Sequence, residues 1–237
     1  MKKKKNLLII GKKSFIAQNL HKDLKKKNIK IILISFESFI KNYKSLINTT
    51  NIVLNCTSNK KFVLNKYQSK NDHDLFIAKK IYKFNIKLIT LSTRKIYKSK
   101  FNIKESYIKK PKCNYSKNKL ISENAVKKIM KDKLLILRIA NTIGLPIVNK
   151  RKLHKTFVDI FFNTIKNGYI YDSAGIYKDF VPIKKLSQII FKLIQKNSYG
   201  TFNVSTGKKI YINELIKWLN YHNKHNTTVV PLEKKFN

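Results

Sequence analysis

Residues 6–20 read NLLIIGKKSFIAQNL, and the rest of the chain repeats the pattern that this stretch begins. Residues 6–10 form a short apolar run without polar alternation, which predicts a buried strand. Gly11 follows at once. Residues 14–26 then have apolar side chains at helical spacing, with Ser14 in the N-cap position. The chain therefore opens with a buried strand, a turn of small residues and a helix.

Four more apolar runs of the same kind follow, and helical patterns separate them. Strands without polar alternation are covered on both faces, so they indicate a parallel sheet between two layers of helices. The sequence predicts an α/β fold, with a Rossmann-type doubly wound parallel sheet over residues 1–142. A small C-terminal α/β part over residues 143–237 partly returns to it. The predicted strands are 29–35, 51–56, 86–91 and 134–139, and the longer helices include 113–131, 154–166 and 183–195.

The composition is that of a globular protein, with 43% hydrophobic residues among 237. A formal net charge of +40 normally suggests a nucleic acid or an anionic membrane as partner. The lysines are spread along nearly every segment, however, so we expect neither partner and keep nucleic-acid binding only as a third hypothesis. Cys56 and Cys113 have no metal-binding spacing, and no apolar stretch reaches membrane-spanning length. We expect a cytoplasmic protein without a metal site.

The first turn is a candidate phosphate-binding site. In doubly wound folds, amides at the N-terminus of the first helix face the pyrophosphate of a dinucleotide, and small residues let the backbone approach. Only Gly11 remains of a three-glycine pattern, and Ser14 and Ala17 occupy the other small positions. On the turn alone, a dinucleotide site and an ordinary strand–helix connection both stay open.

Tyr115 and Lys119 are a candidate proton-transfer pair, because residues four apart on a helix share one face. An ammonium near a phenol favours the phenolate and lowers the tyrosine pKa. Such a tyrosine can give or take a proton near neutral pH. Thr93, which follows the predicted strand 86–91, could hydrogen-bond the same reacting oxygen. The alternative is a chance spacing in a chain that is rich in lysine.

Seven segments, in order, resemble the extended short-chain dehydrogenase/reductase superfamily, specifically its NAD-dependent epimerase/dehydratase family. LLIIGKKSFIAQNL is similar to the T-G-x-x-G-F-I-G-x-x-L opening of that family, and NIVLNCTSN to its strand and small-residue turn along the cofactor. LSTRKIY resembles S-[ST]-x-x-x-Y, and KCNYSKNKLISEN resembles P-Y-x-x-S-K-x-x-x-E. LRIANTIG, KDFVPIKKLSQII and GTFNVSTGKKIYINEL are similar to three later segments. Each match is loose, but their order and spacing are specific.

The resemblance implies an NAD(P)-dependent oxidoreductase or epimerase that acts on a nucleotide sugar, with NAD or NADP as cofactor. Tyr115 would be the general acid/base, Lys119 would lower its pKa and contact the nicotinamide ribose, and Thr93 would hydrogen-bond the reacting oxygen. Asn141 would lie near the substrate, which the C-terminal part would bind. Relatives are often dimers through the helix that carries Tyr115, so the resemblance allows a homodimer. The cofactor-binding residues that it implies are Gly11, Ser14, Phe15, Ile16, Ser35, Thr57, Tyr115 and Lys119.

Departures from the family pattern narrow the expected reaction. The 4,6-dehydratases of the family carry an acidic pair directly after the catalytic threonine, and Arg94 and Lys95 stand there instead. Without that carboxylate a proton is not easily taken from carbon, which argues against a dehydratase. This leaves a 4-epimerase or a 4-keto-reductase, and the short span between Ser35 and Asn51 is nearer to the reductases.

The choice of cofactor stays open on the sequence. The second strand ends at Ser35 without the acidic residue that would hold the adenosine ribose of NAD. Glu37 is near in sequence, and Lys30 or Lys41 could instead meet the 2′-phosphate of NADP. The eroded glycine turn also supports a second hypothesis, a catalytically silent dinucleotide-binding protein.

Overall fold

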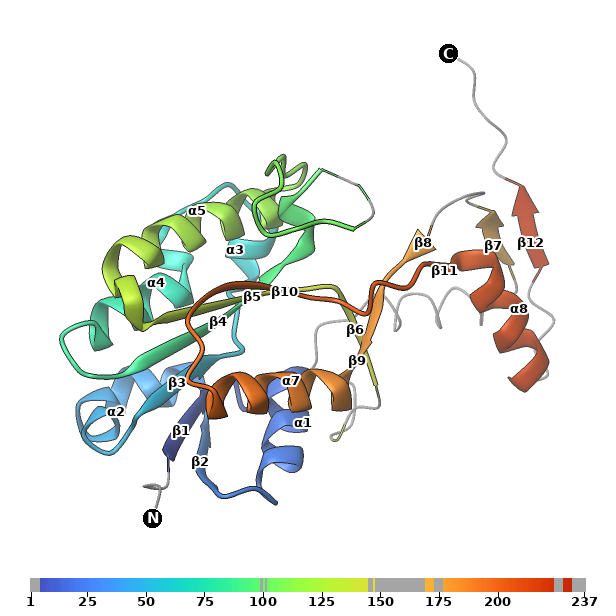
Figure 1. The fold of residues 1–237 in the computed structure, drawn as a ribbon. Coiled ribbons are helices and arrows are strands. Elements are labelled where there is room, and N and C mark those ends of the chain that lie inside the picture. The colour runs from blue at the N-terminus through green and yellow to red at the C-terminus, as the bar shows by residue number, and fades with distance from the viewer. Residues whose placement is uncertain are drawn as a thin grey trace.

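The structure is a computed structural model, and it describes residues 5–98, 100, 102–144, 147, 169–172, 177–223 and 228–231. Its main feature is a sheet of six parallel strands (Figure 1). The five strands expected in the first 142 residues all belong to this sheet. The six strands are β1 (Lys5–Ile10), β2 (Ile29–Ile34), β3 (Ile52–Asn55), β4 (Lys87–Thr93), β5 (Leu134–Ile139) and β10 (Gly200–Val204).

The strand order is β10-β5-β4-β3-β1-β2, which confirms the doubly wound sheet. The chain passes from β1 to β2 on one side and then crosses to β3 on the other side of β1. The order therefore reverses between β1 and β3, and ligands of such sheets bind at this point, beyond the carboxyl ends of the strands. The order differs from the 3-2-1-4-5-6 arrangement of many dinucleotide-binding sheets. The reason is that the short span after β2 forms helix α2 (Phe36–Asn48) and adds no strand outside β2.

Helices cover both faces of the sheet. On one face lie α1 (Phe15–Leu24) and α7 (Ile183–Gln195), which pack against each other. On the other face lie α2, α4 (His73–Ile81) and α5 (Asn114–Met130). The shorter helices are α3 (Lys60–Leu64), η1 (Ser69–Asn71), η2 (Arg94–Ile96) and η3 (Lys131–Lys133).

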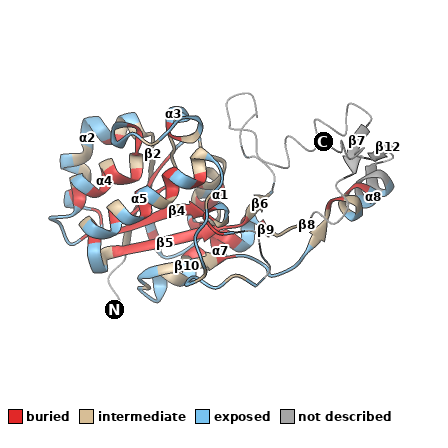
Figure 2. Ribbon diagram, turned by 90° about the horizontal axis from the view of Figure 1, so that it is seen from above, coloured by how far each residue is buried: buried red, intermediate tan, exposed pale blue. Residues whose placement is uncertain are grey.

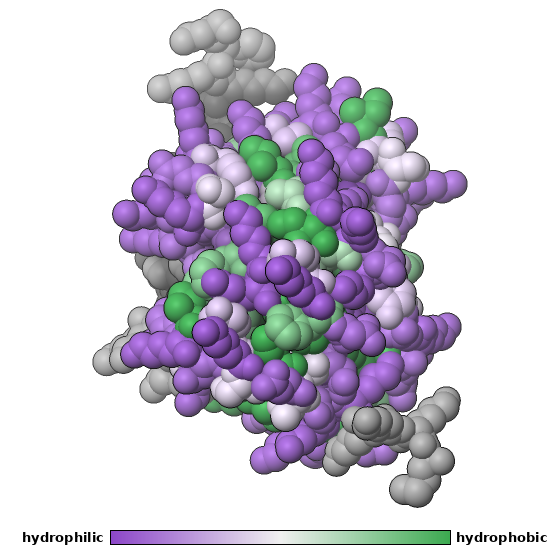
Figure 3. Space-filling view, turned by 90° about the vertical axis from the view of Figure 1, so that its left-hand side faces the viewer, coloured by the Kyte–Doolittle hydropathy of each residue, from purple (hydrophilic) through white to green (hydrophobic). Residues whose placement is uncertain are grey.

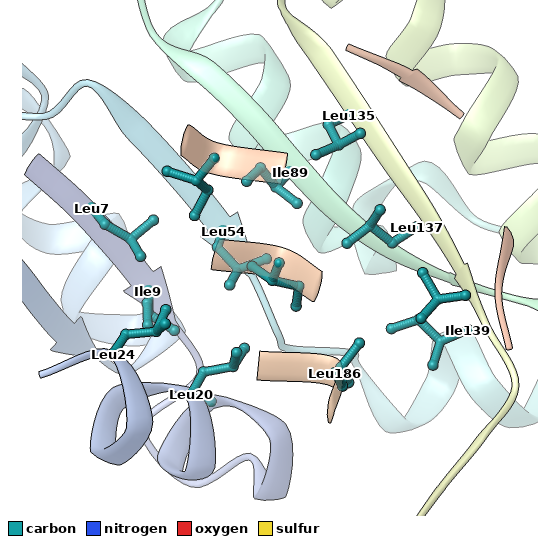
Figure 4. Packing of buried hydrophobic residues seen from close by; sticks show 14 of the residues in the cluster. Leu7, Ile9, Leu20, Leu24, Leu54, Ile89, Leu135, Leu137, Ile139 and Leu186 are labelled. Carbon is teal, nitrogen blue, oxygen red and sulfur yellow. The ribbon is translucent and has the colours of Figure 1, made fainter. Parts of the chain in front are cut away.

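The strand side chains alternate between two cores, as a strand period of two requires. Leu7 and Ile9 pack toward α1 and α7, whereas Leu8 and Ile10 pack toward α2, α4 and α5. Figure 2 shows the buried strands between helices whose outer faces are exposed, and Figure 4 shows Leu20 and Leu186 on one side of the sheet. These two cores hold the strand ends in place, and the candidate site lies at those ends.

The C-terminal residues partly return to this core, since α7 covers the sheet and β10 pairs with β5. Two small ladders extend from it: β6 (Asn141–Ile143) pairs with β9 (Phe180–Pro182), and β8 (Tyr177–Lys178) pairs with β11 (Ile210–Tyr211). Helix α8 (Ile212–Asn223) and the pair β7 (Tyr169–Asp172) and β12 (Thr228–Pro231) lie to one side of the main sheet (Figure 1). The helix predicted at residues 154–166 lies outside the described residues, and the boundary at 142/143 stays a prediction.

Candidate active site

The turn after β1 is tight because Gly11 has a conformation that glycine favours. Its φ is +128°, and an added Cβ would lie 3.2 Å from the carbonyl carbon of Cys56 and 3.1 Å from Cγ2 of Thr57. The N–H groups of Gly11 and Lys12 both donate to the Ile34 carbonyl, at 2.7 and 2.9 Å. The carboxyl ends of β1, β2 and β3 are thereby packed together. Gly11 and Thr57, two of the predicted cofactor-binding residues, are neighbours here.

Helix α1 begins directly after this turn. Ser14 is its N-cap, and the Ser14 hydroxyl accepts from the Ala17 N–H at 3.5 Å. Phe15 and Ile16 form the first turn of α1, and both side chains are partly buried against the core beside the sheet. A helix N-terminus carries partial positive charge and unpaired N–H groups, so this end suits an anion. The three predicted residues are thus at the end of α1 that favours phosphate.

Ser35 lies at the end of β2, as predicted, but its hydroxyl is used by the fold. It caps α2 by accepting from the Ser38 N–H at 3.1 Å. Glu37 is in the first turn of α2. Its pKa is lowered, first by a hydrogen bond from its own backbone N–H and then by Ser35, with smaller contributions from Lys13 and His73. Glu37 therefore supplies the negative charge near the end of β2.

A buried polar group follows the end of β3. The Asn55 Oδ1 accepts from the N–H and the hydroxyl of Thr57, at 2.9 and 2.8 Å. The Thr57 oxygen is in turn 2.8 Å from Nδ1 of His73. Because the threonine hydroxyl donates to Asn55, the histidine Nδ1–H donates to Thr57. The His73 ring stacks on Phe36 with centroids 3.5 Å apart, and burial lowers its pKa to about 4. His73 is therefore neutral.

Lys119 is buried on α5 and pairs with Asp74 on α4. Its Nζ donates to Asp74 Oδ2 at 2.9 Å, and the two side chains are 7% and 6% exposed. The other carboxylate oxygen accepts from Asn55 Nδ2 at 2.7 Å. Burial opposes the charge of Lys119, but Asp74 outweighs it, so the pKa of Lys119 is raised and the ammonium stays charged. Sequence reasoning missed both Asp74 and Asn55.

Tyr115 lies one turn before Lys119 on α5 and is partly buried. Its pKa is raised, because desolvation by the surrounding protein outweighs the Lys119 charge, and Asp74 raises it further. The lysine acts in the predicted direction, but the net shift is opposite to the lowering that we expected. The main cause is desolvation of the phenol, and the Asp74 carboxylate adds to it. The spacing of Tyr115 and Lys119 could reveal neither.

Thr93 is the last residue of β4 and is buried. It pairs with Ile139 at the end of β5, so it lies at the same edge of the sheet as Gly11 and Thr57. The Thr93 oxygen accepts from the Lys95 N–H at 3.2 Å. Asn141 follows β5, and its Nδ2 donates to the Asp179 carbonyl at 3.0 Å, which joins β6 to β9. The predicted residues thus gather beyond the carboxyl ends of the strands.

Glu123 on α5 forms a second buried ion pair, with Arg138 on β5, which the sequence did not predict. Glu123 accepts two hydrogen bonds from Nε of Arg138, at 3.1 and 3.2 Å, and one from Nη2 at 2.6 Å. It also accepts from the Ser92 hydroxyl. Nη1 of Arg138 donates to Tyr97 and to the Glu105 carbonyl. The signal available in the sequence was an arginine inside an otherwise apolar strand.

Within the described part of the chain, no group of histidine, cysteine and acidic residues could hold a metal ion. Among those same residues, no helix has the length and apolar character needed to cross a membrane. A hollow of about 690 Å³ lies between α1 and α7, and its lining includes Lys22, Lys26, Lys184 and Phe191. It contains none of the predicted site residues and is separate from the candidate site.

No family model and no curated protein sequence matches the chain. Solved structures do match it. The UDP-N-acetylglucosamine 4-epimerase from Methanobrevibacter ruminantium M1, in complex with UDP-N-acetylmuramic acid, has a TM-score of 0.78 at 19% identity, over 98% of this chain and 86% of that one. The dTDP-4-dehydrorhamnose reductase from Bacillus anthracis str. Ames, in complex with NADP, has a TM-score of 0.77 at 18% identity, over 98% and 85%.

A third similar structure is the Bordetella bronchiseptica enzyme WbmG in complex with NAD and UDP. Its TM-score is 0.75 at 17% identity, over 98% of this chain and 84% of that one. The likeness covers nearly the whole chain in all three cases. The predicted fold class is therefore confirmed: the chain has the Rossmann-like α/β fold of these three structures.

Proposed function

We propose that the chain is an NAD(P)-dependent oxidoreductase or epimerase of the extended short-chain dehydrogenase/reductase family, acting on a nucleotide sugar. The observation that carries this proposal is where the tyrosine–lysine pair lies. Lys119 is near enough to both Tyr115 and Cys56 for its charge to act on them, and the Cys56 backbone packs against Gly11. The pair therefore stands beside the turn that suits a dinucleotide. Similar solved structures hold NADP, NAD or UDP at this fold, which supports the same ligand classes here.

The residues at the strand ends fit a dinucleotide. The turn at Gly11 leaves little room for a Cβ against Cys56, and the N-terminus of α1 follows it. The Ser14 N–H donates to the Gly11 carbonyl at 2.7 Å, so a pyrophosphate would be held by the first-turn amides of Phe15 and Ile16. Thr57 would flank the cofactor at β3. At the end of β2, Glu37 suits a ribose hydroxyl and Lys13 lies near it, so both NAD and NADP are compatible with this end.

When bound, the cofactor supplies the hydride chemistry, and the protein supplies position and proton control. Tyr115 would give a proton to the sugar oxygen, or take one from it. Lys119, which keeps its charge, would stabilise the phenolate that remains. Because the Thr93 oxygen already accepts from Lys95, the Thr93 hydroxyl proton is directed to another acceptor, such as the reacting oxygen. Asn141 would meet the substrate at the end of β5.

The proposed reaction is 4-epimerisation or 4-keto reduction and not dehydration. Arg94 and Lys95 follow Thr93 directly, and both lie near Lys178. The pKa of Lys178 is lowered first by burial and then by the positive charges of Arg94 and Lys95. Cations therefore surround this side of Thr93 where a dehydratase would need a carboxylate to remove a proton from carbon. The same cations would attract the phosphates of a nucleotide sugar.

A second candidate function is a catalytically silent dinucleotide-binding protein. The observation that favours it is the Lys119–Asp74 pair, because Asp74 raises the pKa of Tyr115 and so opposes its use as a base. Cofactor that co-purifies with the chain, together with no turnover across a panel of nucleotide sugars, would support this candidate.

The test is Tyr115→Phe, compared with Tyr82→Phe, which changes a tyrosine that is 42% exposed and outside the site. We expect Tyr115→Phe to slow hydride transfer by about 10²- to 10⁴-fold, since it removes the acid/base group. Bound NAD or NADP, identified by mass spectrometry of the purified protein, should be unchanged. The assay follows reduced cofactor with 4-keto and 4-hydroxy nucleotide sugars. Undiminished turnover in Tyr115→Phe would contradict the proposed mechanism.

A further inference from the structure

Asp74 holds the buried ammonium of Lys119 from a neighbouring helix. The carboxylate lies in the first turn of α4, and each of its oxygens has a donor: Lys119 Nζ at 2.9 Å and Asn55 Nδ2 at 2.7 Å. A helix N-terminus favours a negative charge in its first turn. The carboxylate is therefore held by groups on α4, β3 and α5 together.

The contacts of Asp74 continue to the turn that faces the cofactor. Asn55 binds Thr57, Thr57 binds His73, and His73 stacks on Phe36 at the start of α2. Each link is a hydrogen bond of 2.7 to 2.9 Å or a stacked ring pair. A continuous polar chain therefore connects the Lys119 ammonium to the residues beside Gly11.

Other titratable groups surround the pair, and none of them replaces Asp74. Asp72, the N-cap of α4, adds negative charge near Lys119, but its own oxygens accept from the Leu75 N–H and the Tyr67 hydroxyl. His73 is neutral. Just after β3, the Cys56 thiol is kept protonated, because burial raises its pKa. Tyr115 on α5 lies near Cys113, the N-cap of that helix, and Glu37 on α2 lies near His73. Asp74 is thus the carboxylate in contact with the ammonium.

We propose that Asp74 is a positioning residue for the Tyr115–Lys119 pair: its carboxylate fixes the Lys119 ammonium and reduces the positive charge that the ammonium presents to the phenol. This inference rests on the proposed function. It also gives the pair a preferred direction, because a phenol that retains its proton is an acid for a keto oxygen and a poor base for a sugar hydroxyl.

The favoured step is the reduction of a keto nucleotide sugar. A bound reduced cofactor would supply a hydride to the carbonyl carbon, the C=O electron pair would move to oxygen, and that oxygen would take the proton of the Tyr115 hydroxyl. The phenolate left behind faces Lys119 and regains a proton from water. Asp74 keeps the ammonium in place through this cycle without touching the substrate.

The test measures the titration of Tyr115 directly, without cofactor or substrate. The protein is labelled with 3-fluorotyrosine, whose ring fluorine lowers the phenol pKa into the range where the protein is folded. The Tyr115 fluorine resonance is assigned by its loss in Tyr115→Phe. We expect Asp74→Asn to titrate at a lower pH than the native protein, by about 1 pH unit, because a like charge has been removed. Lys119→Met should titrate at a higher pH, and Asp74→Glu should keep the native midpoint.

An unchanged or higher midpoint in Asp74→Asn would overturn the proposal. If Asp74→Asn does not fold, as judged by circular dichroism, Asp74→Ser replaces it, with the same expected shift. Activity gives a second readout: for keto reduction, the loss of rate at high pH should move to lower pH by the same amount in the variant. Failure of every protein to bind NAD(P) would refute the proposed function, whereas the fluorine titration would still decide the role of Asp74.

Discussion

Helix α5 carries two buried ion pairs, four residues apart, and they differ in how completely their hydrogen-bonding groups are used. At Glu123, both carboxylate oxygens are engaged by Arg138, and Ser92 donates as well. Arg138 also reaches Tyr97 and the Glu105 carbonyl. This cluster ties β4, β5 and α5 to the segment before α5, and it provides acceptors for four of the five guanidinium N–H groups.

The Lys119 pair is less complete. Within the described part of the chain, its ammonium has one hydrogen-bond acceptor, Asp74, and otherwise lies 5.6 Å from the centre of the Phe62 ring. An ammonium has three N–H groups. Two of them are thus without a protein acceptor at the edge of the sheet where the candidate site lies. A buried pair whose hydrogen-bonding groups are nearly all used stabilises the fold, whereas a pair that uses one of three ammonium N–H groups keeps donors for a ligand.

The largest expected effect tests whether the Glu123–Arg138 pair is the structural one of the two, and it follows the removal of the Glu123 carboxylate. Glu123→Leu leaves the Arg138 guanidinium buried without its carboxylate, so we expect the free energy of unfolding to fall by about 3–5 kcal/mol. The measurement is urea unfolding against Asn124→Ala, an exposed neighbour on the same helix. Hydride transfer per folded molecule should be nearly unchanged. A stability close to that of the native protein would show that the Glu123 pair is not the structural one.

The next expected effect is a loss of stability at low pH, and it should come from His73, which is linked to Asp74 through Thr57 and Asn55. Burial lowers the folded-state pKa of His73 to about 4, whereas the unfolded value is near 6.5. Between these values only the unfolded chain takes up this proton. The stabilisation from neutral His73 is therefore complete above pH 6.5 and is lost as the pH falls toward 4, by about 2–3 kcal/mol.

His73→Gln checks this expectation, because glutamine does not titrate. Urea unfolding of both proteins at several pH values between 4 and 7 should show that the variant loses less stability on acidification than the native protein, by that amount. The described residues of the Glu123 cluster include no histidine, so the cluster should contribute no such slope. Parallel pH dependences in the two proteins would mean that His73 is not held neutral by the fold.

The fold was predictable from local patterns in the sequence. The strands of the sheet are apolar runs such as residues 6–10 and 134–139, and burial on both faces leaves this signature whatever the tertiary partners are. The strand order was not predictable, because it depends on whether the span after β2 adds a strand. That span is short and amphipathic, and it forms α2. Ladders of two residues, such as β8 and β11, exist only through tertiary pairing and leave no local pattern.

The site was predictable in part. The spacing of Tyr115 and Lys119 is local, so the sequence shows it, and both lie on α5 as expected. Asp74 is 45 residues from Lys119, and nothing local links them. The expected lowering of the Tyr115 pKa was therefore wrong in sign, because burial, and after it the Asp74 carboxylate, raise this pKa, and both come from distant segments. Asn55, a polar residue at the end of an apolar run, was the one local signal of this network.

The smallest expected effect is that of Tyr97→Phe, which compares Tyr97, beside the Glu123–Arg138 pair, with Tyr115, beside the Lys119–Asp74 pair. Tyr97→Phe removes a hydroxyl that accepts from Arg138 and donates to Asn203 Oδ1, at 2.8 Å for the second bond. Arg138 keeps its bonds to Glu123 and to the Glu105 carbonyl, so we expect a loss of only about 1–2 kcal/mol in the free energy of unfolding.

Tyr97→Phe should leave both hydride transfer and the Tyr115 fluorine titration unchanged, whereas Tyr115→Phe should remove activity and leave stability nearly as it was. Both tyrosines have a cation beside the ring or hydroxyl and a raised pKa, so proximity to a positive charge does not distinguish them. What differs is that the Tyr97 hydroxyl is used on both sides by the protein. If Tyr97→Phe slowed turnover as strongly as Tyr115→Phe, the degree of hydrogen-bond saturation would not separate structural from functional groups in this molecule.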